Sequence, residues 1–174
     1  MRICTRCLLP ESFPSIRFND EGVCNHCLEF KNRDPRRTEK EQYRKRFESI
    51  VHETRSRSGY HCLSAYSGGK DSTYTLWLLR EHYGLNVLAV TLDSGFVSPK
   101  AFANIRRIVE VLCVDHLFVK PRLDLLVKIF RSVSLANPFP SVALQRASSI
   151  CNACIGLVKN VTLRMAIEQK IPLW

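Results

Sequence analysis

Residues 61–73 read HCLSAYSGGKDST, so a short apolar run ends in two glycines, a lysine and an aspartate between serines. A helical pattern follows at once. In a parallel α/β sheet, the turn after a strand brings a helix N-terminus to the carboxyl edge of the sheet, where ligands bind. Free backbone N–H groups and the helix dipole at that point favour an anion. The stretch therefore predicts an anion site between a strand and a helix.

The residue types in the loop SGGKDS (residues 67–72) indicate which anion it binds. Gly68 and Gly69 permit positive φ and a close approach of the backbone to a ligand. Lys70 adds positive charge, and the serines at both ends add hydroxyl donors. Asp71 makes little sense against bare phosphate, but it fits beside a phosphate-bound Mg²⁺ ion. We therefore expect a magnesium-bound phosphate group at this loop.

Two better-known nucleotide loops do not fit this stretch. A Walker A loop needs a glycine where Ser64 stands, and a serine or threonine directly after the lysine, where Asp71 stands. The pattern G-x-G-x-x-G is absent as well, so a dinucleotide-binding fold loses its main support.

The rest of residues 60–174 alternates apolar runs with helical patterns. We expect strands at 61–66, 86–92 and 115–119, helices at 71–83, 98–113, 122–134 and 152–170, and another strand from Ile171. Such alternation predicts an α/β fold with a parallel, Rossmann-like sheet and helices on both faces. The runs LNVLAVTL and DHLFVK suit strands that are buried on both sides.

In this context the loop resembles the pyrophosphate loop of the PP-loop (N-type) ATP pyrophosphatases, over roughly residues 60–174. The resemblance implies an adenine nucleotide alpha hydrolase-like fold that uses ATP and Mg²⁺. An acceptor oxygen attacks the α-phosphate, pyrophosphate leaves, and a nitrogen or sulfur nucleophile then displaces AMP. By motif position it assigns the phosphates to Ser67, Gly68, Gly69, Asp71 and Ser72, with Asp71 and the less constrained Lys70 as catalytic residues.

A second nucleotide contact is expected where the next strand ends. The segment VTLDSGF places Asp93 at that point, and members of the resembled family use this edge of the sheet for the adenosine. Asp93 is therefore a candidate for ribose or adenine binding, and its alternative role is that of a turn or capping acid.

Four of the eight cysteines form two knuckles near the N-terminus. Cys4 and Cys7 are followed, after 16 residues, by Cys24 and Cys27. Four thiolates at this spacing predict a tetrahedral structural Zn²⁺ site, which would fold a zinc-ribbon module at residues 1–30. His26 lies between two of the ligands, and we expect it to be a neighbour of the metal.

Cys151 and Cys154 form a third C-x-x-C pair at the start of the last helical pattern, where the dipole favours a thiolate. Three interpretations remain open: two ligands of an iron–sulfur cluster or second metal, a redox or sulfur-handling pair, and a structural role. We expect Cys62 and Cys113 to be core thiols.

Residues 31–59 are strongly charged, and a helix is expected near 38–56, so this segment reads as a basic helical linker. The net charge of +10 favours anionic partners. No apolar run approaches the length of a membrane span, and the N-terminus lacks the apolar stretch of a signal peptide. We therefore expect a cytoplasmic protein without a membrane partner.

Two branches of the resembled superfamily place a cysteine module before the loop. The opening ICTRCLLPESFPSIRFNDEGVCNHC and the segment AIEQKIPLW resemble N-acetyl sugar amidotransferases, which implies a sugar acceptor and ammonia from a glutaminase partner. The tRNA thiolation enzymes are the second choice, with a tRNA acceptor, a sulfur donor and an iron–sulfur cluster that Cys151 and Cys154 would help to ligate. Against the second choice, a third cluster cysteine is missing.

A different class stays open, namely a non-catalytic nucleotide- or RNA-binding module. The resembled domains continue past a fourth strand, which would begin here at Ile171. We accordingly expect a sheet that lacks its C-terminal strands and a chain that forms a homo-oligomer or is completed by another chain.

Overall fold

The computed structural model describes residues 1–31 and 35–174 of the chain. They fold as two compact units, Met1–Ile50 and Val51–Trp174, each of which is described by itself. The boundaries expected at residues 30 and 59 remain predictions.

The first unit consists of cysteine-bearing turns, a short helix and most of a second, long helix that ends in the other unit. Its turns are joined by two isolated antiparallel bridges, Ile3 with Pro10 and Phe18 with Cys24. Helix α1 (Asn25–Lys31) starts beside the second cysteine knuckle, and α2 (Pro35–Arg55) contains the predicted basic helix, which starts three residues earlier than expected.

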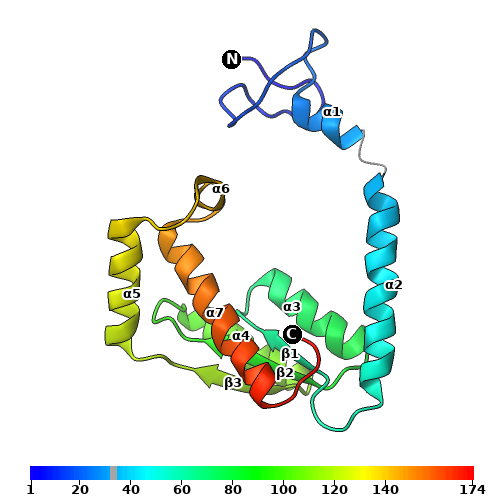
Figure 1. The fold of residues 1–174 in the computed structure, drawn as a ribbon, viewed down its shortest axis with the longest axis vertical. Coiled ribbons are helices and arrows are strands. Elements are labelled where there is room, and N and C mark those ends of the chain that lie inside the picture. Colours follow the sequence, from blue (N-terminus) through cyan, green and yellow to red (C-terminus); the bar gives the residue numbers. More distant parts are fainter. Residues whose placement is uncertain (32–34) are drawn as a thin grey trace. The chain divides into compact units, whose positions relative to one another are not determined.

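The second unit is built on a parallel three-stranded sheet, which confirms the predicted α/β fold (Figure 1). The strands are β1 (Cys62–Ala65), β2 (Val87–Leu92) and β3 (Asp115–Val119), in the order β1-β2-β3. In the register, Leu63 lies opposite Leu88, and Val90 lies opposite Leu117. The three strands predicted at 61–66, 86–92 and 115–119 are present, within one residue at either end.

Helices connect these strands in the predicted order. They are α3 (Lys70–Trp77) with a π-helical turn η1 (Leu78–His82), α4 (Pro99–Val111), α5 (Leu123–Ala136), the short α6 (Ser141–Leu144) and α7 (Ser149–Glu168). The sequence did not predict α1 or α6, because helices this short show too few periods of an apolar pattern.

The helices cover both faces of the sheet. Both parallel crossovers from β1 to β3 run in the same direction, so the right-handed rule places α3 and α4 on one face. On the other face, α7 packs onto β1 and β2, where Ala166 and Ile171 form a buried cluster with Leu63, Leu88 and Val90. The sheet is therefore a central layer whose carboxyl edge stays accessible between two helical layers.

Strand β3 differs from the prediction. All six residues of β2 are buried, as expected, but Leu117 and Phe118 of β3 are 45% and 42% exposed. The prediction that DHLFVK is buried on both sides was wrong, because β3 is the edge strand of the described sheet and has a neighbour on one side only.

The segment from Ile171 begins to pair as the predicted further strand. Leu173 forms a parallel bridge with Cys62, and the N–H of Leu63 donates to the carbonyl oxygen of Leu173 at 2.9 Å. The indole N–H of Trp174 donates to the Thr162 hydroxyl at 2.7 Å. These contacts place the segment beside β1, on the side opposite β2.

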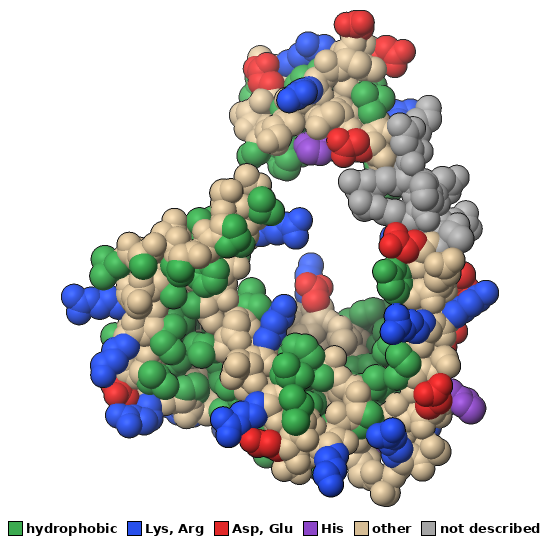
Figure 2. All heavy atoms as spheres, viewed as in Figure 1, with side chains coloured by type: hydrophobic (Ala, Val, Ile, Leu, Met, Phe, Trp, Pro, Cys, Tyr) green, Lys and Arg blue, Asp and Glu red, His purple; other side chains and the backbone are tan. Residues whose placement is uncertain are grey.

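Apolar side chains remain exposed on the second unit. Figure 2 shows them over α5 and α7, where Leu125, Leu135 and Ile167 are among the exposed large residues. By length and composition alone, α7 could also cross a membrane, which corrects the expectation that no apolar segment is long enough. Thr162 and Ala166 of this helix are nevertheless buried in the folded unit.

The two remaining single cysteines lie in different surroundings. Cys62 is buried in β1 as predicted, and burial raises the pKa of its thiol to about 11. Cys113 is exposed, so its prediction as a core thiol was wrong. It lies just after α4 with a φ of 48°, in a turn where its N–H donates to the carbonyl oxygen of Glu110.

Candidate functional site

The SGGKDS loop connects β1 to α3 and is held closely against α4. Gly68 has a φ of 75°, and a Cβ atom at this position would lie 2.6 Å from Cγ1 of Ile105 and 3.2 Å from the carbonyl oxygen of Ala101. The side-chain amide of Asn104 donates to the carbonyl oxygen of Gly68 at 2.6 Å. Only glycine fits this backbone conformation and this contact, so the loop has one defined path.

The loop delivers an uncapped helix N-terminus to the carboxyl edge of the sheet. Gly69 is the N-cap residue of α3, with extended backbone and no side-chain cap. The first N–H groups of α3 therefore have no capping side chain and point outward. The Ser67 and Ser72 hydroxyls lie 3.0 Å apart, and Ser72 donates to the Gly69 carbonyl oxygen at 3.1 Å. The arrangement matches an anion site that is ordered before a ligand arrives.

Lys70 and Asp71 both lie exposed in the first turn of α3. Asp71 is favourable there because the helix dipole is positive at this end, whereas Lys70 is unfavourable for the same reason. Neither side chain has an ion-pair partner within residues 1–31 and 35–174. A cation at a helix N-terminus with no acidic partner is consistent with a role toward an external anion.

Asp93 lies at the carboxyl end of β2, as predicted, but its carboxylate already has partners in the chain. Oδ1 accepts the N–H of Gly95 at 2.9 Å, and Oδ2 lies 3.6 Å from Nζ of Lys120. Its side chain is only 15% exposed. Asp93 therefore orders the turn after β2, and its role in ribose or adenine binding stays a prediction.

A small apolar cavity adjoins the loop. Its volume is about 120 Å³, and its lining residues are Ala65, Tyr66, Ser67, Val90, Thr91, Leu92, Val97 and Val158. They come from the ends of β1 and β2, from the segment before α4, and from α7. A polar loop therefore meets an apolar recess at the carboxyl edge.

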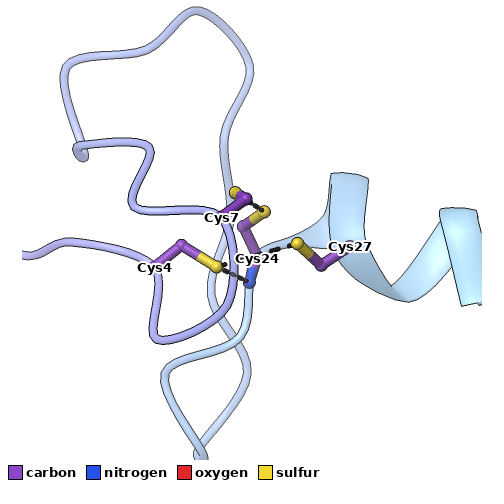
Figure 3. A group of neighbouring side chains, drawn as sticks. All are labelled: Cys4, Cys7, Cys24 and Cys27. Atoms are coloured by element: carbon purple, nitrogen blue, oxygen red, sulfur yellow. Dashed lines mark hydrogen bonds between the residues drawn. The ribbon is translucent and has the colours of Figure 1, made fainter.

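The four N-terminal cysteines form a compact sulfur cluster (Figure 3). One ligand atom from each of Cys4, Cys7, Cys24 and Cys27 lies within 4.8 Å of the others. The sulfur of Cys4 also accepts the backbone N–H groups of Arg6 and Cys24, at 3.4 and 3.3 Å. This donor set and geometry fit a tetrahedral S₄ metal site.

The pKa values within this cluster diverge. Burial raises the pKa of Cys4, but backbone N–H groups of Cys7, Arg6 and Cys24 outweigh it and lower this pKa to about 6. Hydrogen bonding to the sulfur of Cys7, followed by burial, raises the pKa of Cys27 to about 12. The surroundings therefore stabilise the Cys4 thiolate and disfavour a second thiolate at Cys27. A bound divalent cation would offset the repulsion between the negatively charged sulfurs.

His26 lies beside this cluster. Its ring packs edge-on against Phe13, with ring centroids 5.6 Å apart, and it does not belong to the set of four sulfurs. Its buried Nε2 atom has no hydrogen-bond partner within the described residues.

Cys151 and Cys154 lie in the first two turns of α7, close to the carboxyl end of β2. The helix is capped by Ser148, whose hydroxyl accepts the Cys151 N–H at 3.2 Å. Burial, followed by the charge of Cys151, raises the pKa of Cys154, and a hydrogen bond with Ser94 lowers it. Ser94 directly follows Asp93, and Val158, one turn beyond Cys154, lines the apolar cavity. The structure thus brings this pair next to the loop site.

Some residues of the site could not be identified from the sequence. Two residues from distant parts of the chain contact predicted site residues: Asn104 contacts Gly68, and Lys120 contacts Asp93. Two others contact the residue before the loop, directly in the case of Thr91 and through Thr91 in the case of His116. Their residue types and spacing carry no local motif, so only the fold reveals them.

Comparison with known proteins supports the fold. No family model matches the chain. The uncharacterized protein MJ1599 of Methanocaldococcus jannaschii is 33% identical over 101 residues, which are 58% of this chain and 35% of that protein.

The NH3-dependent NAD synthetase of Campylobacter jejuni, solved with a nitrate ion, has a TM-score of 0.51 at 12% identity, over 71% of this chain and 50% of that one. This likeness shows a shared fold.

A second solved structure is the U34-tRNA thiolase NcsA of Methanococcus maripaludis with its [4Fe-4S] cluster. It has a TM-score of 0.42 at 18% identity, over 99% of this chain and 53% of that one. The chain thus spans about a third of the curated relative and about half of each solved structure.

Proposed function

We propose that this chain binds ATP as an adenylating pyrophosphatase, which splits ATP into AMP and pyrophosphate while activating an acceptor. The observation that carries the proposal is the uncapped N-terminus of α3, held at the carboxyl edge by Gly68 and Asn104. Its N–H groups, with the serine hydroxyls and Lys70, suit the charge that grows on a departing pyrophosphate. The shared fold with the NAD synthetase is consistent with this assignment.

The parts of ATP would divide between the loop and the cavity. The β- and γ-phosphates would lie at the first turn of α3, and the apolar recess beside Ser67 would receive the base or ribose. A bound Mg²⁺ would neutralise phosphate charge, and the exposed Asp71 carboxylate is the nearest candidate to hold it. Asp93 would act on the nucleotide through the turn that it orders.

For the acceptor, we propose an N-acetyl sugar and a nitrogen nucleophile, so that the chain acts as an amidotransferase with ammonia from a glutaminase partner. The support is the resemblance at both ends of the chain, in residues 3–27 and 166–174. The net charge of +10 suits an acceptor that carries phosphate groups.

A second candidate function is tRNA thiolation, and one observation favours it. Cys154 makes a hydrogen bond with Ser94 beside the nucleotide site, which is where sulfur chemistry on an adenylated acceptor would need a thiol-bound group. Cys151 and Cys154 would then supply two ligands of an iron–sulfur cluster, with a further ligand from outside the described cysteines.

We further propose that Cys4, Cys7, Cys24 and Cys27 hold a structural zinc ion. The four sulfurs leave no open coordination position, and Cys4 and Cys24 are fully buried. Such a site would stabilise a unit whose turns bury few other side chains, and it would take no part in the adenylation chemistry.

Product analysis tests the proposed function. The protein is incubated with Mg²⁺ and ATP labelled at the α- or γ-phosphate, together with either a nucleotide-linked N-acetyl sugar and ammonium or unmodified tRNA and sulfide. The proposal expects AMP and pyrophosphate with the sugar, whereas dependence on tRNA would favour the second candidate. Release of ADP and phosphate, or ATP binding without any cleavage, would contradict an adenylating enzyme. The matched control is Asp71→Asn, which keeps the size of the side chain and removes its charge.

A further inference from the structure

A partly buried hydrogen-bond network joins β3, β2 and the residue before the SGGKDS loop. His116 of β3 lies with its Nε2 atom 2.8 Å from the hydroxyl oxygen of Thr91 on β2. The Thr91 hydroxyl in turn donates to the carbonyl oxygen of Tyr66 at 2.6 Å. Tyr66 is the residue immediately before the loop, so the hydrogen-bond network connects the edge strand β3 to the point where the loop leaves β1.

The donors and acceptors of this hydrogen-bond network have only one consistent arrangement. A threonine hydroxyl has a single hydrogen, and here it is directed at the Tyr66 carbonyl. The imidazole must therefore donate its Nε2–H to Thr91, which selects the Nε2–H tautomer of His116. Burial lowers the pKa of His116, so the ring is neutral near pH 7. The Thr91 hydroxyl then donates one hydrogen bond and accepts another.

The side chain of Tyr66 extends the same hydrogen-bond network into α3. Its hydroxyl lies 3.1 Å from the hydroxyl oxygen of Thr73, in the first turns of that helix. Tyr66 is 2% exposed, and its ring lies edge-on to the ring of His116 with centroids 6.3 Å apart. Both ends of the loop, the residue before it and the helix after it, are therefore tied to Tyr66, which Thr91 and His116 hold in place.

We propose that Thr91 and His116 are positioning residues for the pyrophosphate loop, a role that rests on the proposed function. Thr91 is buried, and the hydrogen bond of His116 is to Thr91, so both side chains contact the loop region through Tyr66. They act by fixing the Tyr66 carbonyl, and through it the direction of the N–H groups at the start of α3. A misaligned N–H group loses much of its hydrogen bond to an anion, because the bond weakens steeply with angle. Tyr66 and Thr91 also line the apolar recess, whereas His116 does not, so His116→Leu is the variant that separates an effect on the loop from an effect on the recess.

Separate ligands for the two halves of the site test this role. Calorimetric titration measures the affinities of wild type and variants for magnesium pyrophosphate, which probes the loop, and for adenosine, which probes the recess. Thr91→Val removes the hydroxyl at constant shape, and Thr91→Ser keeps it. His116→Leu removes the donor, whereas His116→Gln keeps an N–H donor near the position of Nε2.

We expect Thr91→Val and His116→Leu to bind magnesium pyrophosphate about five- to tenfold more weakly, which is the loss of one buried hydrogen bond. Adenosine affinity should stay within about twofold in His116→Leu, and Thr91→Ser and His116→Gln should stay within about threefold of wild type for both ligands. This split between the ligands, with rescue by the conservative variants, would not arise from a general loss of structure.

The contrary outcomes are distinct. If wild type binds magnesium pyrophosphate and Thr91→Val binds it equally well, the positioning role is wrong and the proposed function stands. If both affinities fall together in His116→Leu, which changes no residue that lines the recess, the residues support the fold in general and the positioning role is again wrong. If wild type itself binds no magnesium pyrophosphate, the proposed function fails and takes this inference with it.

Discussion

Gly68→Ala should disrupt the loop far more than the same substitution one residue later. The added Cβ would lie 2.6 Å from Cγ1 of Ile105 and 3.2 Å from the Ala101 carbonyl oxygen, while φ at this position is 75°. Ile105 is fully buried, and the carbonyl belongs to the backbone of α4, so neither neighbour can move freely. The loop or the helix must therefore shift.

The cost has two parts. An alanine held at positive φ costs roughly 1–2 kcal/mol, and overpacking a filled contact costs typically about 1–3 kcal/mol. The free energy of unfolding should fall by about 2–5 kcal/mol, which for a chain of this size lowers the melting temperature by on the order of 10 °C. Gly69→Ala is the matched control, since φ there is −77° and the nearest atom to an added Cβ, Oγ of Ser67, lies at 3.4 Å.

Thermal and urea unfolding of both variants, followed by circular dichroism, measure this difference. We expect Gly69→Ala to stay within about 1 kcal/mol of wild type, because its backbone conformation suits alanine. Gly68→Ala should also lose affinity for magnesium pyrophosphate as the loop moves. Equal unfolding free energies for the two variants would refute the packing of the loop described above.

Three further predictions concern the cysteines and the pH dependence. Cys24→Ser should lower the bound zinc from about one ion per chain to none, as measured by mass spectrometry of the metal. The control Cys113→Ser should retain the zinc, and a full zinc content in Cys24→Ser would contradict the proposed zinc site. Because burial raises the pKa of Cys62 to about 11, iodoacetamide at pH 8 should modify the exposed Cys113 and Cys151 long before Cys62. Peptide mass spectrometry at successive times measures the order of modification, and early modification of Cys62 would argue against its burial. Since burial lowers the pKa of His116 below 6.5, the unfolded chain binds a proton that the folded chain does not, so the free energy of unfolding should fall as the pH drops from 7 through this region. Urea titrations should show a smaller slope in His116→Gln, and an unchanged slope would exclude His116 as its source.

Local residue patterns predicted the parts of the fold that depend on local chemistry. The loop follows from six consecutive residues, whose glycines, serines and charges have few other uses at a strand end. The sulfur cluster follows from the spacing of its two knuckles, because two C-x-x-C pairs at that spacing are typical of a metal site. The strands follow from apolar runs that only a sheet buries well.

The remaining features depend on contacts between distant parts of the chain. The run that forms β3 has the composition of a central strand, and only the order of the strands makes it an edge. The links from His116 to Thr91 and from Cys154 to Ser94 join residues on different elements, with no motif that connects them. Asp93 was visible as a carboxylate at a strand end, but its two partners, Gly95 and Lys120, appear only in the folded turn.

The site proposed for ATP can be examined in a crystal structure with magnesium and α,β-methylene-ATP, which resists cleavage between the α- and β-phosphates. We predict that the β- and γ-phosphates lie against the backbone N–H groups of residues 69–72, and that the adenosine lies in the recess beside Ser67. A nucleotide bound elsewhere on the chain, with the turn between β1 and α3 left empty, would contradict it.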